Sequence, residues 1–114
     1  MARARVLRRL SLVLAGLCLA GCLSPTLPLP PPSRPDVGVP DADGYARLQG
    51  YAAPHVEVLA LNRNNKLLAG QITGRDSRYD FKIPAESGDQ IELWYVDGSE
   101  ESQTVVVEVP YHLQ

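Results

Sequence analysis

Alternating apolar and polar residues, arranged in short runs between turn-forming residues, dominate the chain after residue 44. In the clearest run, Tyr79, Phe81 and Ile83 alternate with charged residues. A period of two places successive side chains on opposite faces of a β-strand, so this run has one apolar and one charged face. No stretch of this region has the apolar spacing of an amphipathic helix. The pattern therefore predicts an all-β domain.

Turn-forming residues divide this region into short strands. Asparagines at positions 62, 64 and 65 mark one turn, and Asp97 followed by Gly98 is a strong hairpin signal. Strands at intervals of roughly 8 to 12 residues are typical of sandwiches and small barrels. We therefore expect a small Greek-key β-sandwich of six or seven strands over residues 44–114. The strands that the pattern places clearly are 45–51, 55–61, 66–73, 78–83, 90–96 and 103–109.

One predicted strand leaves open which of its faces is buried. Ile91, Leu93 and Tyr95 fall on one face of this strand, and Trp94 and Val96 fall on the other. In one interpretation Trp94 is buried in the core and the tyrosine face is outside. In the other, Trp94 is an exposed aromatic residue on a sheet, which is a common anchor for sugars and for protein partners.

The N-terminal region differs from the rest of the chain. Residues 1–9 contain four arginines and no acidic residue, and residues 10–20 form an apolar run. These are the basic and hydrophobic regions of an export signal. A helix of that apolar length rises only about 16 Å, whereas the hydrocarbon core of a membrane is roughly 30 Å thick. We therefore expect a removable signal peptide over residues 1–21.

The residues that end this leader, Leu19-Ala20-Gly21-Cys22, resemble the lipobox of bacterial lipoproteins. The resemblance implies cleavage between Gly21 and Cys22, a thioether-linked diacylglycerol on Cys22 and a further acyl chain on the new amino terminus. Two or more acyl chains give a stable membrane anchor. Because Leu23 rather than aspartate follows the cysteine, the outer membrane is the expected location. The alternative is an ordinary cleavage site that happens to precede a cysteine.

A proline-rich segment follows the cysteine. Residues 23–40 contain seven prolines, which fix the backbone φ angle and remove hydrogen-bond donors. Such a segment populates extended polyproline II structure, and its upper-limit reach is about 55 Å. We therefore expect a disordered linker over residues 22–43. The alternative is a proline-rich docking motif for an aromatic groove.

Several short motifs in the β region resemble those of a known domain type. They are Ala53-Pro54, Tyr79-Asp80-Phe81 and Gly88-Asp89 before an apolar strand. Their order over residues 44–110 resembles prealbumin-like or carboxypeptidase-regulatory-like domains and bacterial Ig-like repeats. The resemblance implies a β-sandwich and carries no catalytic residues. The chain departs from those domains at residues 74–79, which lack the glycine usually found before the aromatic strand.

Charge and cysteine content narrow the functional classes. Without the four arginines of the leader, seven basic residues face thirteen acidic ones, so the mature chain has a net charge of about −6. Nucleic-acid binding needs a clustered basic surface, which makes that partner class a poor fit. Cys18 and Cys22 both lie in or beside the leader, so no disulfide is expected within the mature domain.

Candidate metal ligands and nucleophiles are scattered along the sequence. His55 and His112 are far apart, whereas a zinc site needs three or four converging ligands. The acidic residues at positions 36, 41 and 43 have neither the full spacing nor the distal glutamate of a calcium loop. None of the four serines from Ser77 to Ser102 lies in a nucleophile elbow. We therefore expect no metal, no cofactor besides the lipid on Cys22, and no enzymatic activity.

These observations together predict a non-catalytic envelope lipoprotein. Its β-sandwich would act as a binding, structural or accessory module, and its partners would be the membrane and an envelope protein or glycan. A carbohydrate- or peptidoglycan-binding lipoprotein is an alternative, with Trp94, Tyr95 or Tyr51 as the stacking platform. The hairpin acids Asp97 and Glu100 are further candidates, because loops on β scaffolds often carry recognition. A small envelope hydrolase or hydrolase inhibitor is a third class.

Overall fold

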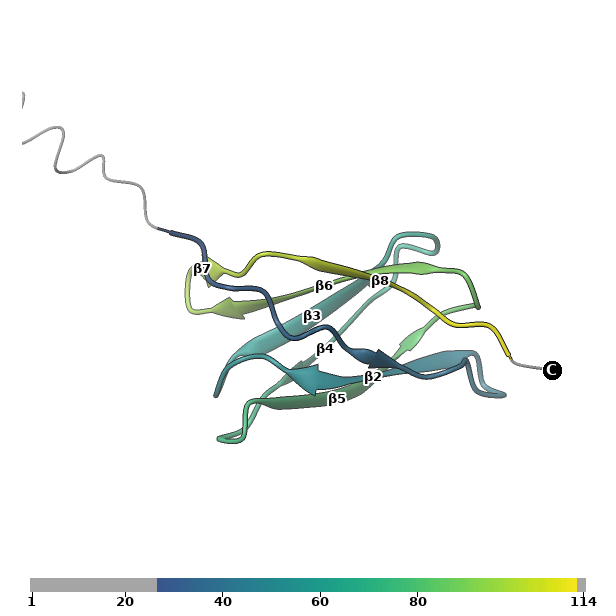
Figure 1. Ribbon diagram of the computed structural model, residues 1–114, viewed down its shortest axis with the longest axis horizontal. Coiled ribbons are helices and arrows are strands. Elements are labelled where there is room, and N and C mark those ends of the chain that lie inside the picture. Colours follow the sequence, from purple (N-terminus) through teal and green to yellow (C-terminus); the bar gives the residue numbers. More distant parts are fainter. Residues whose placement is uncertain (1–26, 113–114) are drawn as a thin grey trace, which may run out of the picture.

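The computed structural model describes residues 27–112, so the predicted signal peptide, the lipobox and Cys22 lie outside the described residues. The described part is all-β, as predicted, and its strands form two antiparallel sheets (Figure 1). The strands are β1 (Asp36–Val37), β2 (Tyr45–Tyr51), β3 (Glu57–Asn62), β4 (Leu68–Ile72), β5 (Arg78–Pro84), β6 (Gln90–Asp97), β7 (Glu100–Glu101) and β8 (Val105–Glu108).

The two sheets differ in size and in connectivity. The smaller sheet has the order β1-β2-β5, and the larger sheet has the order β4-β3-β6. Both β7 and β8 pair with the remaining edge of β6, one near each end of that strand. The pairings β2–β5 and β3–β6 each join strands that are separated by two others in the sequence. The chain therefore crosses repeatedly between the sheets, as the predicted Greek-key sandwich requires.

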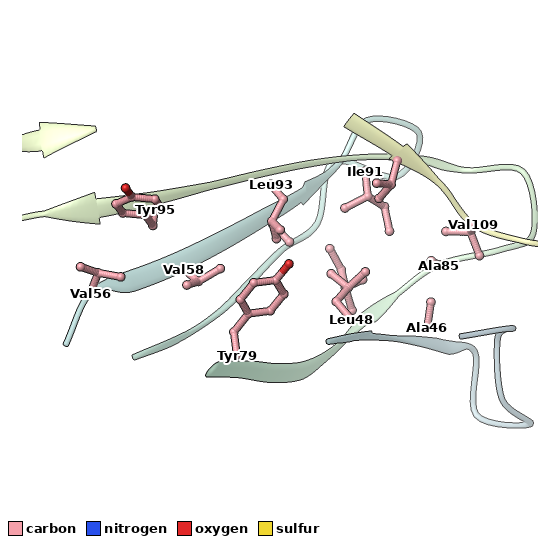
Figure 2. Close-up of a cluster of buried hydrophobic side chains, with 13 residues drawn as sticks. Ala46, Leu48, Val56, Val58, Tyr79, Ala85, Ile91, Leu93, Tyr95 and Val109 are labelled. Atoms are coloured by element: carbon pink, nitrogen blue, oxygen red, sulfur yellow. The ribbon is translucent and has the colours of Figure 1, made fainter. Parts of the chain in front are cut away.

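The core lies between the two sheets and follows from the alternation of apolar residues (Figure 2). The predicted inward face of β5 is confirmed, since Tyr79 and Ile83 are buried and the charged residues between them are exposed. On β6 the buried residues are Ile91, Leu93 and Tyr95. Each large apolar side chain buried in this way contributes about 1.5–3 kcal/mol. These contacts hold the two sheets together without a disulfide in the described part.

A buried asparagine joins two turns at one end of the sandwich. The Asn62 side-chain amide donates to the Pro84 carbonyl at 3.1 Å and to the Asp89 carboxylate at 2.8 Å. Its side-chain oxygen accepts a bond from the Asn64 backbone at 2.9 Å. The turn between β3 and β4 is thereby fixed to the turn between β5 and β6. Asn62 is fully buried, so these bonds satisfy groups that have no access to water.

The structure corrects the predicted start of the folded domain. Residues 29–38, which we call the strap, lie against the sandwich instead of forming a free linker (Figure 1). Leu29 forms a parallel bridge with Ser102 beside the larger sheet, and β1 pairs with β2 in the smaller one. The strap therefore connects the two sheets on one side of the sandwich.

The prolines of the strap do not prevent this packing, because its hydrogen bonds come from the residues between them. Ser33 exchanges bonds with the Tyr51 backbone, donating at 2.7 Å and accepting on its hydroxyl at 2.8 Å. The Ser33 carbonyl also accepts the Tyr79 hydroxyl at 2.9 Å. Pro32 and Pro35 are buried. Proline removes a donor but keeps an apolar ring, so it can cover the core where no donor is needed.

Candidate binding surface

The outward side of the larger sheet, which we call the outer face, is the main candidate surface. Its residues follow from the strand register. Because Ala60 and Leu93 point into the core, their neighbours along β3 and β6 point outward. The residues of the outer face on β3, β4, β6 and β8 are Glu57, Leu59, Leu61, Leu68, Gly70, Ile72, Gln90, Glu92, Trp94, Val96, Val106 and Glu108.

Trp94 lies at the centre of this face, which resolves the alternative that the sequence left open. It is half-buried and lies directly opposite Leu59 on β3, which in turn lies opposite Gly70 on β4. A Cβ at Gly70 would come within 2.9 Å of the Leu59 side chain. Glycine at this position therefore leaves room for the Leu59 side chain, which lies between Gly70 and Trp94 across the strands.

The β4 side of the outer face exposes two large apolar side chains. Leu68 is 59% exposed and Ile72 is 72% exposed. Leu61 lies opposite Leu68, and Leu59 lies opposite Trp94, so apolar side chains lie on neighbouring strands of this face, while the exposed Glu57 lies between Ile72 and Val96. Single exposed apolar residues are ordinary in soluble domains, but contiguous apolar patches mark binding sites. This surface was missed from the sequence, although the uncharged stretch between Lys66 and Arg75 is a signal that could have indicated it.

The outward side of the smaller sheet has the opposite character. Arg47 donates two hydrogen bonds to the Asp80 carboxylate, at 2.7 and 2.6 Å, and Lys82 donates one to Asp41 at 3.0 Å. The bonds from Arg47 lower the pKa of Asp80. The pKa of Asp41 is lowered chiefly by the Tyr45 backbone N–H and then by Lys82. The outward side of the smaller sheet thus carries two ion pairs at its centre, whereas Trp94 and Leu59 occupy the centre of the outer face.

The structure does not bring the predicted stacking residues together. Tyr95 is only 4% exposed and belongs to the core, so it is not available as a platform. Tyr51 is exposed but lies on β2 in the other sheet, with the Arg78 guanidinium 5.9 Å from its ring centre. Of the three aromatic candidates, only Trp94 lies on the outer face. Trp94 and Tyr95 lie on opposite sides of the sheet because successive residues of β6 point to opposite faces.

The predicted loop candidates lie at the end of the sandwich where the strap begins. Asp97 and Glu100 are paired neighbours in the hairpin between β6 and β7, and both are exposed. They lie at the edge of the sheet and are separate from the centre of the outer face (Figure 1). The hairpin predicted at Asp97 and Gly98 is present, and Gly98 has the positive φ angle of 63° that favours glycine.

Polar groups within the described residues are used mainly to hold the fold. The buried Ser102 hydroxyl accepts a bond from the Tyr95 backbone at 2.8 Å and donates to the Gln103 carbonyl at 2.9 Å. Both histidines are exposed. Between residues 27 and 112, no group of three or more histidine, cysteine or acidic side chains is placed to hold a metal ion. In the same range, no helix is long and apolar enough to cross a membrane.

One open pocket lies away from the outer face, at the end of the sandwich near Asn62. It has a volume of about 380 Å³ and its lining includes Asn64, Asn65 and Asp89. Its amides are already engaged, because Asn64 accepts from the Gln90 backbone at 3.0 Å and Asn65 donates to the Pro84 carbonyl at 3.0 Å. These bonds fix the two asparagine side chains as part of the turn, and Glu86 also lines the pocket.

Comparison with protein-family models gives no match, and comparison with curated proteins gives none either. The resemblance of residues 19–22 to a lipobox and that of residues 44–110 to prealbumin-like domains therefore stay predictions. The outer face consequently has to be interpreted from its own composition and geometry.

Proposed function

We propose that the chain is a membrane-anchored, non-catalytic envelope lipoprotein whose β-sandwich binds another envelope protein through the outer face. The observation that carries the binding role is the contrast between the two outward sides of the sandwich. One carries ion pairs such as Arg47–Asp80 at its centre, and the other presents Trp94 opposite Leu59 at its centre, beside the Arg63–Glu92 ion pair. A half-buried tryptophan within an apolar surface is typical of the centre of a protein interface.

The neighbours of Trp94 favour a protein partner over a glycan. A sugar-binding platform combines an aromatic ring with polar groups that bond to hydroxyls. Trp94 instead lies between Leu59 across the strands and Val96 along its own strand. Glu92 lies two residues before Trp94 on β6, and its carboxylate accepts a hydrogen bond from the Arg63 guanidinium at 2.7 Å. The glycan-binding alternative therefore has less support from this surface.

The strap changes how the proposed anchor would place the domain. From Cys22 to Leu29 the chain has seven residue steps, which span at most roughly 25 Å in any conformation. Packing of Leu29 beside Ser102 then keeps the hairpin that carries Asp97 and Glu100 nearest the lipid. The proposed lipoprotein would thus hold its sandwich close to the membrane, within less than half the reach expected of a free linker.

The non-catalytic part of the proposal is supported by the use of the buried polar side chains. Asn62 and Ser102 each hold a turn, and the Thr73 hydroxyl accepts from the Val56 backbone at 3.0 Å and donates to the Ala53 carbonyl at 2.6 Å. Within the described part, these groups serve the fold and form no reactive cluster.

Photocrosslinking from the two outward sides tests the proposal. A photoreactive amino acid is placed at Leu61 on the outer face or, as the matched control, at Arg47 on the charged side, in the full chain in its native cells. We expect a discrete protein adduct from Leu61, weakened by Trp94→Ala, and none from Arg47. Equal labelling from both sides, or adducts with glycan alone, would contradict the proposed protein-binding role.

A further inference from the structure

The strand β4 forms an edge of the larger sheet. Among the described residues it pairs only with β3. The Asn62 backbone donates to the Leu67 carbonyl at 3.0 Å, and the Thr73 backbone donates to the Val56 carbonyl at 2.9 Å. Because hydrogen-bonding direction alternates along a strand, the residues between these two points alternate as well. Leu68, Gly70 and Ile72 therefore direct their backbone N–H and C=O groups away from β3.

This edge is open and lacks the features that usually prevent strand pairing. Gly70 has no side chain, so its exposure is exposure of the backbone itself. Natural edge strands are blunted by charged residues, proline or bulges, and β4 reads Leu-Ala-Gly-Gln-Ile without any of these. The edge of β5 differs, because the Gln71 side chain accepts the Asp80 backbone N–H at 2.6 Å. A side chain therefore bonds to the backbone at the centre of the β5 edge, whereas the backbone of Gly70 at the centre of the β4 edge is exposed.

We propose that β4 pairs antiparallel with β4 of a second copy of this chain, with the two Gly70 residues opposite each other. In this register Leu68 of one copy lies opposite Ile72 of the other, on both sides of the two-fold axis. The three residues with outward-directed backbone groups thus all fall at hydrogen-bonded positions. The two larger sheets become one continuous sheet, and the outer faces of the two copies join. The pairing does not depend on the partner proposed for the outer face.

The composition of β4 supports a second copy as the occupant of this edge. The strand carries no charged residue, so pairing with itself places no like charges opposite each other. It also sets the exposed Leu68 of each copy against the exposed Ile72 of the other, and apolar cross-strand pairs of this kind are favourable. Pairing of two five-residue strands buries less surface than the roughly 1,200–2,000 Å² of a stable interface. We therefore expect a reversible dimer that forms when chains are concentrated in one membrane.

Cysteine pairs across the two-fold axis test the register. Opposite residues at a hydrogen-bonded antiparallel position have Cα atoms about 5.5 Å apart, within the range of roughly 4.4–6.8 Å that a disulfide spans. Residues 68 of the two copies would be about 14 Å apart, because positions 68 and 72 are four residue steps apart along the strand. A chain with Leu68→Cys should thus crosslink to a chain with Ile72→Cys but not to itself.

The experiment uses the full chain in its native cells, with differently tagged Leu68→Cys and Ile72→Cys chains co-expressed and oxidised with copper phenanthroline. Non-reducing electrophoresis should show the heterodimer several-fold above each single variant and above the parent chain, which gives the background from Cys22. The matched control is Arg78→Cys with Lys82→Cys on the edge of β5, which has the same spacing and should give no heterodimer.

Four outcomes would overturn the proposal. Three of them are no heterodimer from variants that accumulate like the parent, equal crosslinking in each single variant, and equal crosslinking from the β5 control. The fourth is a disulfide to a different protein in place of the second copy. Because positions 68 and 72 are exposed, both substitutions should leave the fold intact, and unchanged resistance to protease checks this.

Discussion

The contact of the strap with the core gives a sharp prediction at Gly50. A Cβ at this position would collide with the Tyr79 hydroxyl and would lie 2.6 Å from the Tyr79 ring carbon that carries it. It would also lie 2.9 Å from the Ser33 side-chain oxygen. Such contacts are closer than real Cβ atoms make, so either the strap or the Tyr79 ring must move. Overpacking of this kind costs about 1–3 kcal/mol. We therefore expect Gly50→Ala to lower the free energy of unfolding by that amount.

Gly38 provides the matched control on the same strap. A Cβ there would meet only Arg47 atoms, the nearest at 3.6 Å, which is an ordinary contact. Replacement of glycine by alanine at a compatible site stabilises a protein by about 0.4–1 kcal/mol, because it restricts the unfolded chain. Gly38→Ala should therefore be neutral or stabilising. The assay is urea unfolding of the purified chain, followed by circular dichroism.

A double-mutant cycle tests the physical cause. Tyr79→Phe removes the hydroxyl that Gly50→Ala would meet, so the penalty of the alanine should shrink in that background. We expect a coupling free energy of at least about 0.5 kcal/mol between the two positions. If Gly50→Ala is as stable as the parent, or if the two changes are additive, the strap does not pack on Tyr79 as described and the reasoning is refuted.

Three further predictions concern buried and aromatic groups. Asn62→Ala should lower the unfolding free energy by about 1–3 kcal/mol, because it leaves buried partners unpaired, whereas Asn65→Ala on the exposed turn should cost less; urea unfolding of both checks this. Burial raises the pKa of Tyr79 to about 12, so the folded state keeps a proton that the unfolded state loses. Stability should therefore be full below pH 10 and fall by up to about 2 kcal/mol as the pH rises toward 12, and Tyr79→Phe should lack this part of the loss. Trp94 is the single tryptophan, so acrylamide should quench the fluorescence of the folded chain measurably, and quenching as weak as that of a core tryptophan would place Trp94 inside.

The strands with strict alternation could be predicted from the sequence. The expected strands 78–83 and 90–96 correspond to β5 and β6 within one residue at each end. Both are bounded by strong turn signals, and Tyr79 and Ile83 of β5 face the core as the alternation predicts. Local pattern and tertiary packing agree in these segments, and for that reason the sequence was sufficient there.

The strap could not be predicted, because local composition and long-range packing disagree there. The seven prolines of residues 23–40 predict a free linker. Only the contacts of the strap with distant residues reveal that this part of the segment is packed. The Ser33 backbone and side chain meet Tyr51 and Tyr79, which lie much later in the chain. No local pattern indicates such contacts, so the boundary at residue 44 was placed too late.

The orientation of β6 was undetermined for a different reason. Both faces of this strand carry large apolar residues, so alternation alone did not decide which face is buried. Pairing with β3 decides it, because Tyr95 and Leu93 lie opposite the small buried residues Val58 and Ala60. Trp94 is thereby left on the outer face, where it became the centre of the candidate site.

The central claim of the proposed function is the anchor at Cys22. It is tested most directly by mass spectrometry of the N-terminal peptide from the chain purified out of native membranes. The account predicts a peptide that begins at Cys22 and carries the mass of a diacylglycerol and an additional acyl chain, and a Cys22→Ser chain that is found outside the membrane. A peptide that begins elsewhere, or an unmodified Cys22, would contradict it.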